Sequence, residues 1–249
     1  MLTSYFLNTK EMSPIEKKFI NGSHLKILAV IVMLIDHIGY HILDFIEDAH
    51  QVWFTCAGLE FSPYFISRFL GRSAFPIFSF LLVEGFIHTH NRLKYGRNLL
   101  LFAFISELPW NLINSNQLLF ERQNVFFTLF LGFLSLSVLK RFRTSVKKLL
   151  VSLLLIFTAA YFLRADYGYF GVAFIIAIYV FRSNQMLMTI IGTCLLPQKW
   201  IGGLAFIPIA FYNGERGCIQ GPLAKYAFYA FYPIHLLVLY FVKLGMFGT

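Results

Sequence analysis

Runs of hydrophobic residues separated by short polar clusters recur along the chain from residue 25 almost to its end. A helix needs roughly 20 mostly apolar residues to cross the bilayer core of about 30 Å, so these runs predict transmembrane helices. Because several runs are shorter, the pattern fixes their number only to about nine. The fold class predicted is all-α, a polytopic integral membrane helix bundle. We expect the spans at residues 25–43, 72–90, 95–113, 124–140, 148–164, 167–182, 185–198, 200–213 and 226–245.

The placement of basic residues predicts the orientation of these helices. With the N-terminus in the cytoplasm, 15 of the 21 Lys and Arg residues fall in cytoplasmic segments, as expected for a membrane protein. Residues 1–24 are then a cytoplasmic N-terminal segment, and residues 25–249 form a single membrane domain. The first outer loop, about 44–71, is rich in aromatic residues. We expect it to lie in the membrane interface, and the alternative is a lid over an acceptor site.

The composition agrees with a membrane protein. Hydrophobic residues make up 58% of the chain and charged residues only 13%, whereas soluble domains have about twice that charged fraction. The net charge of +9 arises from short basic clusters between apolar runs, which are typical of membrane topology rather than of nucleic-acid binding. The three cysteines, Cys56, Cys194 and Cys218, form no CxxC motif, and we expect no metal.

The first span, LKILAVIVMLIDHIGYHIL, contains the pair Asp36 and His37 within its apolar run. An ionisable side chain at membrane depth usually faces the bundle interior and often serves a function. In a helix, Lys26 and His37 lie on one face and are separated by about 16 Å along the axis. The pair is therefore a candidate site, and the plainer alternative is a polar contact between two helices.

The second span ends in a dense polar stretch, HTHNRLKYGR. Glu84 and His88 are four residues apart and share one helical face. The basic residues that follow, Arg92 and Arg97 among them, begin the next helix, and such a turn suits a phosphate group. Anchoring of a cytoplasmic loop explains the same bases without a ligand.

Three further acidic or titratable residues are expected in the membrane or at its edge. Glu107 lies beside Pro109, which favours a kink, and a cation such as Arg72 is its expected partner. Asp166 precedes the sixth span and is expected to cap that helix. His235 lies within the last span, a second histidine at membrane depth.

The segments LKILAVIVMLIDHIG, GRSAFPIFSFLLVEGFIHTHNRLKY, SELPWN, NVFFTLFLG, ADYGYFG, YNGERG and FYAFYPIHLL together resemble the TraX family, and they are distributed along the chain nearly from end to end. The namesake of this family acetylates the N-terminus of pilin in conjugation systems. The chain also resembles, more distantly, the membrane acyltransferase family 3, in which a basic residue and a histidine separated by ten residues mark the first helix, as do Lys26 and His37. The resemblance implies an enzyme of the bacterial inner membrane that uses acetyl-CoA. It leaves a peptide or pilin amine, a glycan and a lipid-like molecule open as acceptors.

This resemblance gives the candidate residues their expected roles. His37 is the expected general base, because imidazole titrates near neutral pH. The other candidate catalytic residues are Asp36, Glu84, Glu107 and His235, and the candidates for binding the phosphates of acetyl-CoA are Lys26, His88, Arg92, Arg97 and Arg72. We expect Asp36 to pair with Arg72, and Glu84, Glu107 or His235 to complete the His37 site. A proton-coupled transporter that uses the same buried acids and histidines is the main alternative, and a scaffold protein without activity is another.

Overall fold

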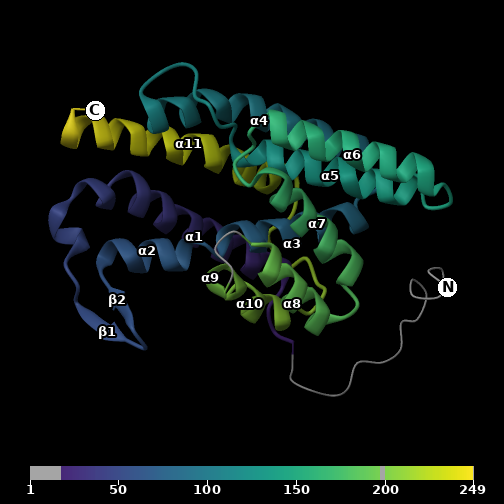
Figure 1. Ribbon diagram of the computed structural model, residues 1–249, viewed down its shortest axis with the longest axis horizontal. Coiled ribbons are helices and arrows are strands. Elements are labelled where there is room, and N and C mark those ends of the chain that lie inside the picture. Colours follow the sequence, from purple (N-terminus) through teal and green to yellow (C-terminus); the bar gives the residue numbers. More distant parts are fainter. Residues whose placement is uncertain (1–17, 197–199, 249) are drawn as a thin grey trace.

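A computed structural model describes residues 18–196 and 200–248, and this part of the chain is predominantly helical (Figure 1). Most of the expected cytoplasmic segment 1–24 lies outside the described residues. The α-helices are α1 Gly22–His41, α2 Pro63–Gly71, α3 Ala74–His88, α4 Arg92–Ser115, α5 Val125–Arg141, α6 Val146–Phe162, α7 Gly168–Phe181, α8 Gln185–Leu195, α9 Trp200–Gly203, α10 Phe206–Ala210 and α11 Pro222–Phe247. Two short 3-10 helices, Leu43–Phe45 and Glu47–His50, follow α1, and an antiparallel hairpin of β1 Phe54–Cys56 and β2 Leu59–Phe61 comes next.

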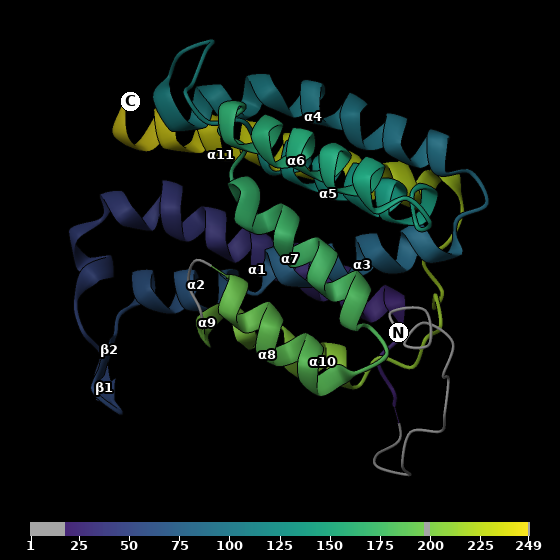
Figure 2. The same cartoon turned by 45° about the vertical axis from the view of Figure 1, so that its right-hand side comes forward.

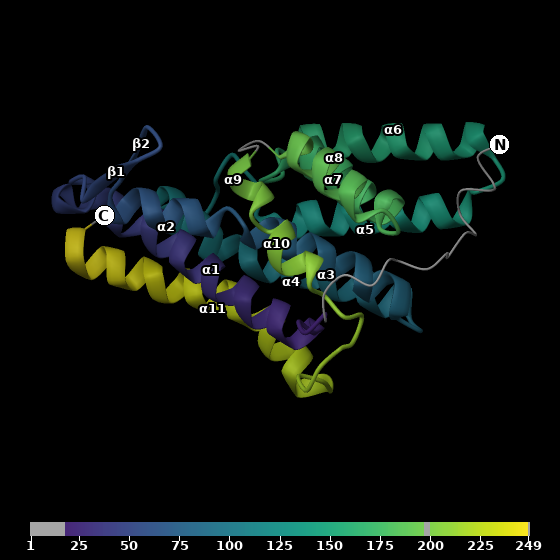
Figure 3. The ribbon, with the colours of Figure 1, turned by 90° about the horizontal axis from the view of Figure 1, so that it is seen from below.

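The helices pack in layers along one long direction (Figures 1 and 2). Helix α11 packs on α4, α4 on α5, and α5 on α6 and α7, which forms one layer. Helix α1 packs on α2 and α3 in a second layer, and α7 joins the two layers through its contacts with α3 and α5. Seen from below, α1 runs beside α11 (Figure 3).

Three helical stretches among the described residues are long and apolar enough to cross a membrane. They are Gly22–Phe45, Pro63–His88 and Leu223–Phe247. Shorter apolar helices such as α7 and α8 accompany them. The composition and these helices together indicate a membrane protein.

The second span is longer than the sequence predicts. It begins at Pro63 rather than near residue 72, and it is interrupted only at residues 72–73 between α2 and α3. Ser62 caps α2 by accepting a hydrogen bond from the backbone N–H of Phe65, and Pro63 occupies the first turn, where a proline costs no hydrogen bond. The expected outer loop 44–71 was therefore wrong in its second part, which is a helix that contacts α1.

The last third of the chain departs from the predicted spans in a different way. Helix α8 ends at Leu195, and the expected continuous span 200–213 is instead two short helices, α9 and α10, of 4 and 5 residues. Neither reaches the length that a single crossing needs. Helix α4, in contrast, continues through Pro109 without interruption.

Two glycines allow α1 and α2 to approach closely. A Cβ atom on Gly39 would lie 2.0 Å from the hydroxyl oxygen of Ser67, and one on Gly71 would lie 2.2 Å from the Cβ of Asp36. Only a residue without a side chain fits at such distances. The close contact holds Asp36 against the backbone at the end of α2.

The beginning of α1 is held by the segment that precedes α11. Asn21 caps α1, and the backbone N–H of Gly22 donates to the carbonyl oxygen of Glu215 at 2.7 Å. The hydroxyl of Ser23 donates to the carbonyl oxygen of Arg216 and accepts from the backbone N–H of Ile219. The YNGERG segment therefore fixes the start of α1 next to the start of α11.

Candidate functional site

His37 and His235 form a direct side-chain pair between α1 and α11. Nδ1 of His37 lies 2.6 Å from Nε2 of His235, and the two rings stack with their centroids 4.9 Å apart. Nδ1 of His235 lies 2.8 Å from the carbonyl oxygen of Phe231, one turn earlier in α11. His235 is buried, and Tyr232 packs edge-on against both rings. The structure thus joins two histidines that are 198 residues apart in sequence.

This chain of contacts determines where the protons lie when both rings are neutral. The carbonyl oxygen of Phe231 only accepts, so Nδ1 of His235 carries a proton and donates it. Nε2 of the neutral His235 ring is then an acceptor, and the proton in the contact between the rings belongs to Nδ1 of His37. Nε2 of His37 is left without a proton. It therefore has a lone pair available to act as a base.

His37 lines a cavity of about 670 Å³ that lies between α1, α2, α4, α11 and the beginnings of α3, α5 and α7. The wall combines charged, polar and aromatic side chains. It is lined by Met33, Asp36, His37, Tyr40, His41, Arg68, Gly71, Arg72, Ala74, Phe75, Phe78, Trp110, Asn114, Phe120, Arg122, Val125, Leu129, Asp166, Tyr167 and Tyr232. A cavity of this size and polarity is large enough for a small molecule or for the end of a larger one.

The cavity contains one closed ion pair. Nη1 of Arg68 lies 2.7 Å from Oδ1 of Asp36 and also donates to the Asp36 carbonyl oxygen at 3.1 Å. Both side chains are mostly buried, and the guanidinium also lies over the Tyr40 ring. We expected Arg72 as a partner of Asp36, and the structure pairs Asp36 with Arg68 instead.

Asp166 was expected to cap the sixth span, but the side chain makes no cap of α7 and faces the cavity instead. It lies in the turn between α6 and α7, outside both helices. Burial raises the pKa of its carboxyl to about 6, while the charge of Arg72 acts in the opposite direction. This acid therefore gives up part of its charge in mildly acidic solution.

Glu84 and Glu107 lie outside the wall of this cavity and have other partners. Oε2 of Glu107 accepts a hydrogen bond from the side-chain amide of Asn124 at 2.6 Å. The prediction that Glu107 pairs with Arg72 is therefore wrong, since Arg72 lines the cavity. Asn124 is fully buried, donates a second bond to the carbonyl oxygen of Ala103 and caps α5. The pair thus links α4 to the start of α5.

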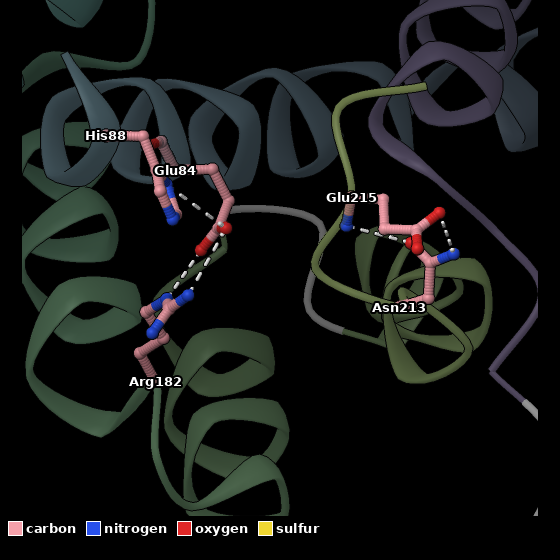
Figure 4. A network of polar contacts seen from close by, with 5 residues as sticks. All are labelled: Glu84, His88, Arg182, Asn213 and Glu215. Atoms are coloured by element: carbon pink, nitrogen blue, oxygen red, sulfur yellow. Dashed lines mark hydrogen bonds and ion pairs between the residues drawn. The ribbon is translucent and has the colours of Figure 1, made fainter. Parts of the chain in front are cut away.

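The buried carboxylate of Glu84 forms a second ion pair, with the partly exposed Arg182 at the end of α7 (Figure 4). Nε and Nη2 of Arg182 donate to the two carboxylate oxygens of Glu84 at 2.5 and 3.2 Å. As the four-residue spacing predicted, His88 lies on the same face: its Nδ1 is 3.8 Å from the carboxylate and 2.9 Å from the Glu84 carbonyl oxygen. The cluster joins α3 to α7, and it does not contact His37.

Several basic residues gather where α1, α4 and α11 begin, a region that we call the basic end. Nζ of Lys26 lies 5.9 Å from the ring centroid of Phe228, in the second turn of α11, and Arg216 is close enough to repel it. Lys225, on the first turn of α11, lies against the rings of Tyr95 and Tyr229. The end therefore draws positive charge from three helices and from the YNGERG segment.

The five expected phosphate-binding residues do not form one group. Arg92 begins α4 and His88 ends α3, with Arg97 one turn later, whereas Arg72 lines the cavity at the opposite end of α3. The 16 residues between Arg72 and His88 correspond to about 24 Å of helix. The prediction that Arg72 shares one phosphate site with His88, Arg92 and Arg97 is therefore wrong. Arg92 itself donates from Nε to the Phe86 carbonyl oxygen at 3.3 Å and lies over the Phe86 ring.

The sequence analysis did not identify Arg68, Arg122 or His41 as site residues. Arg68 lies in the stretch that was expected to be a loop, and Arg122 lies in the connection between α4 and α5. The order Ser62-Pro63 is a helix-start signal that predicts α2, and the spacing of Tyr64 and Arg68 then follows one helical face. The contacts of Arg122 and His41 with the cavity depend on tertiary packing and have no such local signal.

Comparison with known proteins shows the family of the chain. The model of the family described as TraX protein matches residues 21–243. A curated relative, the probable fimbrial assembly protein FimC of serogroup H1 from Dichelobacter nodosus, is 32% identical over 88% of this chain and 94% of its own length. No solved structure matches the chain. The family match covers both histidines of the pair and every residue of the cavity wall, and the chain therefore belongs to the TraX family.

Proposed function

We propose that the protein is an integral membrane acetyltransferase that moves an acetyl group from acetyl-CoA to an amine or hydroxyl of an acceptor. Membership of the TraX family supports this function, because the namesake acetylates pilin. The name of the curated relative, a fimbrial assembly protein, makes a peptide amine such as the N-terminus of a pilin the first acceptor to test. The observation that carries the proposal is the His37–His235 pair at the wall of a polar cavity.

The pair supports the chemistry as follows. Nε2 of His37 takes the proton of the acceptor nucleophile, whose nitrogen or oxygen bonds to the acetyl carbonyl carbon. The carbon–sulfur bond then breaks, and the CoA thiolate leaves with the proton from His37. During transfer the imidazolium of His37 donates from Nδ1 to Nε2 of His235, which stabilises the charge. Arg68 lies on the same wall, where Asp36 balances its charge.

The arrangement of α1 suggests a route for the donor. Lys26 and Lys225 at the basic end attract the phosphates of acetyl-CoA, together with Arg92, Arg97 and His88 nearby. From Lys26 to His37 the distance along the helix is about 16 Å, a length that the pantetheine arm can cover. The acetyl group would then reach His37 from one end of the bundle while the acceptor enters the cavity.

The same proposal sets the topology. We propose a multi-pass protein of the bacterial inner membrane with a cytoplasmic N-terminus, in which α2 and α3 act as one span. The basic end then faces the cytoplasm, where acetyl-CoA is made. The C-terminal end of α11 and the β hairpin, which lie together at the other end of the long axis, face outward (Figures 1 and 3).

Acetyl-CoA binding to the purified protein in detergent tests the donor directly. Calorimetry should give saturable binding that Lys26→Ala and Arg92→Ala weaken, while Lys147→Ala, an exposed basic residue at the start of α6, leaves it unchanged. His37→Ala should keep binding and lose turnover, because it acts on the chemical step. Absence of saturable binding in a folded protein would contradict the proposal and favour a transporter.

A further inference from the structure

The cavity holds more positive than negative charge. Of the described residues that line it, three are arginines and two are aspartates. Arg68 and Asp36 neutralise each other at 2.7 Å. Arg72 lies near enough to Asp36 and Asp166 to attract both carboxylates, and Arg122 attracts Asp166. Neither Arg72 nor Arg122 has a side-chain hydrogen bond or an ion pair within residues 18–196 and 200–248. The three arginines therefore exceed the two aspartates by one positive charge, and the guanidinium groups of Arg72 and Arg122 have hydrogen-bond donors free for an anion.

The backbone around each of these arginines is held in place. The indole N–H of Trp110 donates to the carbonyl oxygen of Arg122 at 2.6 Å, and the next residue, Gln123, donates from its backbone N–H to the carbonyl oxygen of Arg164. Arg72 lies at the break between α2 and α3, next to Gly71, where α1 and α2 pack too closely for a side chain. These contacts fix the positions of both residues before any ligand binds.

His41 adds an independent sign of a ligand. It lines the cavity and is only 3% exposed, yet its Nε2 has no hydrogen-bond partner within the described part of the chain. Leaving a buried polar group without a partner costs about 1–3 kcal/mol, so such a group usually meets a water or a ligand. His41 is one turn after His37 on α1, and their ring centroids are 5.8 Å apart.

We propose that this cavity binds the acceptor through an oxyanion, a carboxylate or a phosphate, held by Arg72 and Arg122 with His41 as a further donor. The inference rests on the proposed function, since it identifies the same cavity as the acceptor site and His37 as the base. Guanidinium groups recognise carboxylate and phosphate oxygens by paired hydrogen bonds, and the low-dielectric surroundings strengthen them. The negative group would orient the acceptor so that its amine or hydroxyl meets Nε2 of His37.

Binding of malonate, used as a simple dicarboxylate, tests this site without acetyl-CoA. The thermal unfolding midpoint of the purified protein is measured against malonate at constant ionic strength, with chloride as the reference salt. Wild type should be stabilised with a saturable dependence. Arg72→Gln and Arg122→Gln should each weaken the apparent affinity about tenfold or more, and Arg141→Gln, the same change on an exposed arginine at the end of α5, should not.

Each variant is first shown to be folded by its circular dichroism and its elution volume. Arg122→Lys gives a second check, because it keeps the charge and loses the paired geometry, and it should weaken malonate less than Arg122→Gln. Phosphatidylglycerol in the micelle should compete with malonate in wild type if a lipid headgroup supplies the oxyanion, and should have no effect if a soluble acceptor does. No malonate stabilisation in wild type, or equal stabilisation in both Gln variants, would overturn the site.

Acetyl-CoA binding separates this inference from the proposed function. If Arg72→Gln and Arg122→Gln leave acetyl-CoA affinity unchanged, the cavity anion belongs to the acceptor. If they weaken acetyl-CoA as strongly as Lys26→Ala does, the donor phosphates occupy the cavity and the acceptor assignment is wrong. Failure of malonate binding alone leaves acetyl transfer untouched, whereas failure of acetyl-CoA binding removes the proposed function and leaves an anion site.

Discussion

Replacement of His235 by alanine removes the atom that accepts the Nδ1 proton of His37. In the structure this contact is 2.6 Å long, and the Phe231 carbonyl oxygen orients His235 from the other side. Without it, either nitrogen of His37 can carry the proton, and the imidazolium formed during transfer has no acceptor. The donor phosphates bind elsewhere, so the variant should lose turnover with little change in the Michaelis constant for acetyl-CoA.

The size of the loss follows from this one hydrogen bond. It is a bond to a charged group in the transition state, and such bonds contribute about 1.5–3 kcal/mol. Each 1.36 kcal/mol corresponds to a factor of ten in rate, so His235→Ala should lower kcat by roughly 10- to 150-fold. His37→Ala removes the base itself and should lower it about 10²- to 10⁴-fold. The double variant should be no worse than His37→Ala, because His235 acts through His37.

Conservative variants of His235 separate a positioning role from a structural one. The acceptor atom is Nε2, whose place the terminal amide group of glutamine reaches and the shorter asparagine does not. His235→Gln should therefore keep kcat within about tenfold of wild type, and His235→Asn should resemble His235→Ala. The assay is transfer of radiolabelled acetyl from acetyl-CoA in bacterial membranes that contain the native acceptor, per amount of folded protein. Wild-type turnover in His235→Ala, or equal turnover in the Gln and Asn variants, would refute the pairing argument.

Three further outcomes concern stability and pH, all measured by thermal unfolding in detergent. Gly71→Ala places a Cβ 2.2 Å from a side-chain atom of α1 and should lower the stability by about 1–3 kcal/mol. Gly245→Ala, where the new Cβ meets open space, should be neutral or stabilising. Equal unfolding midpoints for the two variants would contradict the close packing. Arg182→Met leaves the buried Glu84 carboxylate without its partner. Because Arg182 is 40% exposed, the change should cost roughly half of the 3–5 kcal/mol typical of a fully buried pair. Replacing both Glu84 and Arg182 by Met should recover much of this stability, and no recovery would argue against the ion pair. The pKa of Asp166 is raised from 3.8 to about 6, so its contribution to stability is complete below pH 3.8 and is lost as the pH rises through 6. This loss of stability should be absent in Asp166→Asn, and a loss that persists in the variant would belong to another group.

Local sequence patterns predicted most of the helices and the two histidines of the site. The apolar run around His37 and the one around His235 each indicate a helix with a titratable group inside, and both helices occur as expected. Membrane depth alone made each residue a candidate. His235 was one of three residues expected to complete the His37 site. Which of the three contacts His37 could not be derived, because the contact depends on how α1 and α11 pack, and no local pattern encodes that packing.

Charge partners were the least predictable part. Asp36 was expected to pair with Arg72, which is four residues after its observed partner Arg68. The sequence predicted that the second span begins near residue 72, whereas its helix begins at Pro63. Once α2 is extended to Pro63, Arg68 falls level with Asp36 and Arg72 moves to the end of the helix. The Glu84–Arg182 pair joins residues 98 apart, and nothing in either segment indicates the other.

The most direct test of the whole account is acetyl transfer by wild type and His37→Ala in sealed vesicles with radiolabelled acetyl-CoA on the cytoplasmic side only. Wild type should label the acceptor. A folded His37→Ala variant that still binds acetyl-CoA should label it about 10²- to 10⁴-fold more slowly. Equal labelling by the two proteins would contradict the role of His37 and, with it, the central claim that this histidine pair is the transfer site.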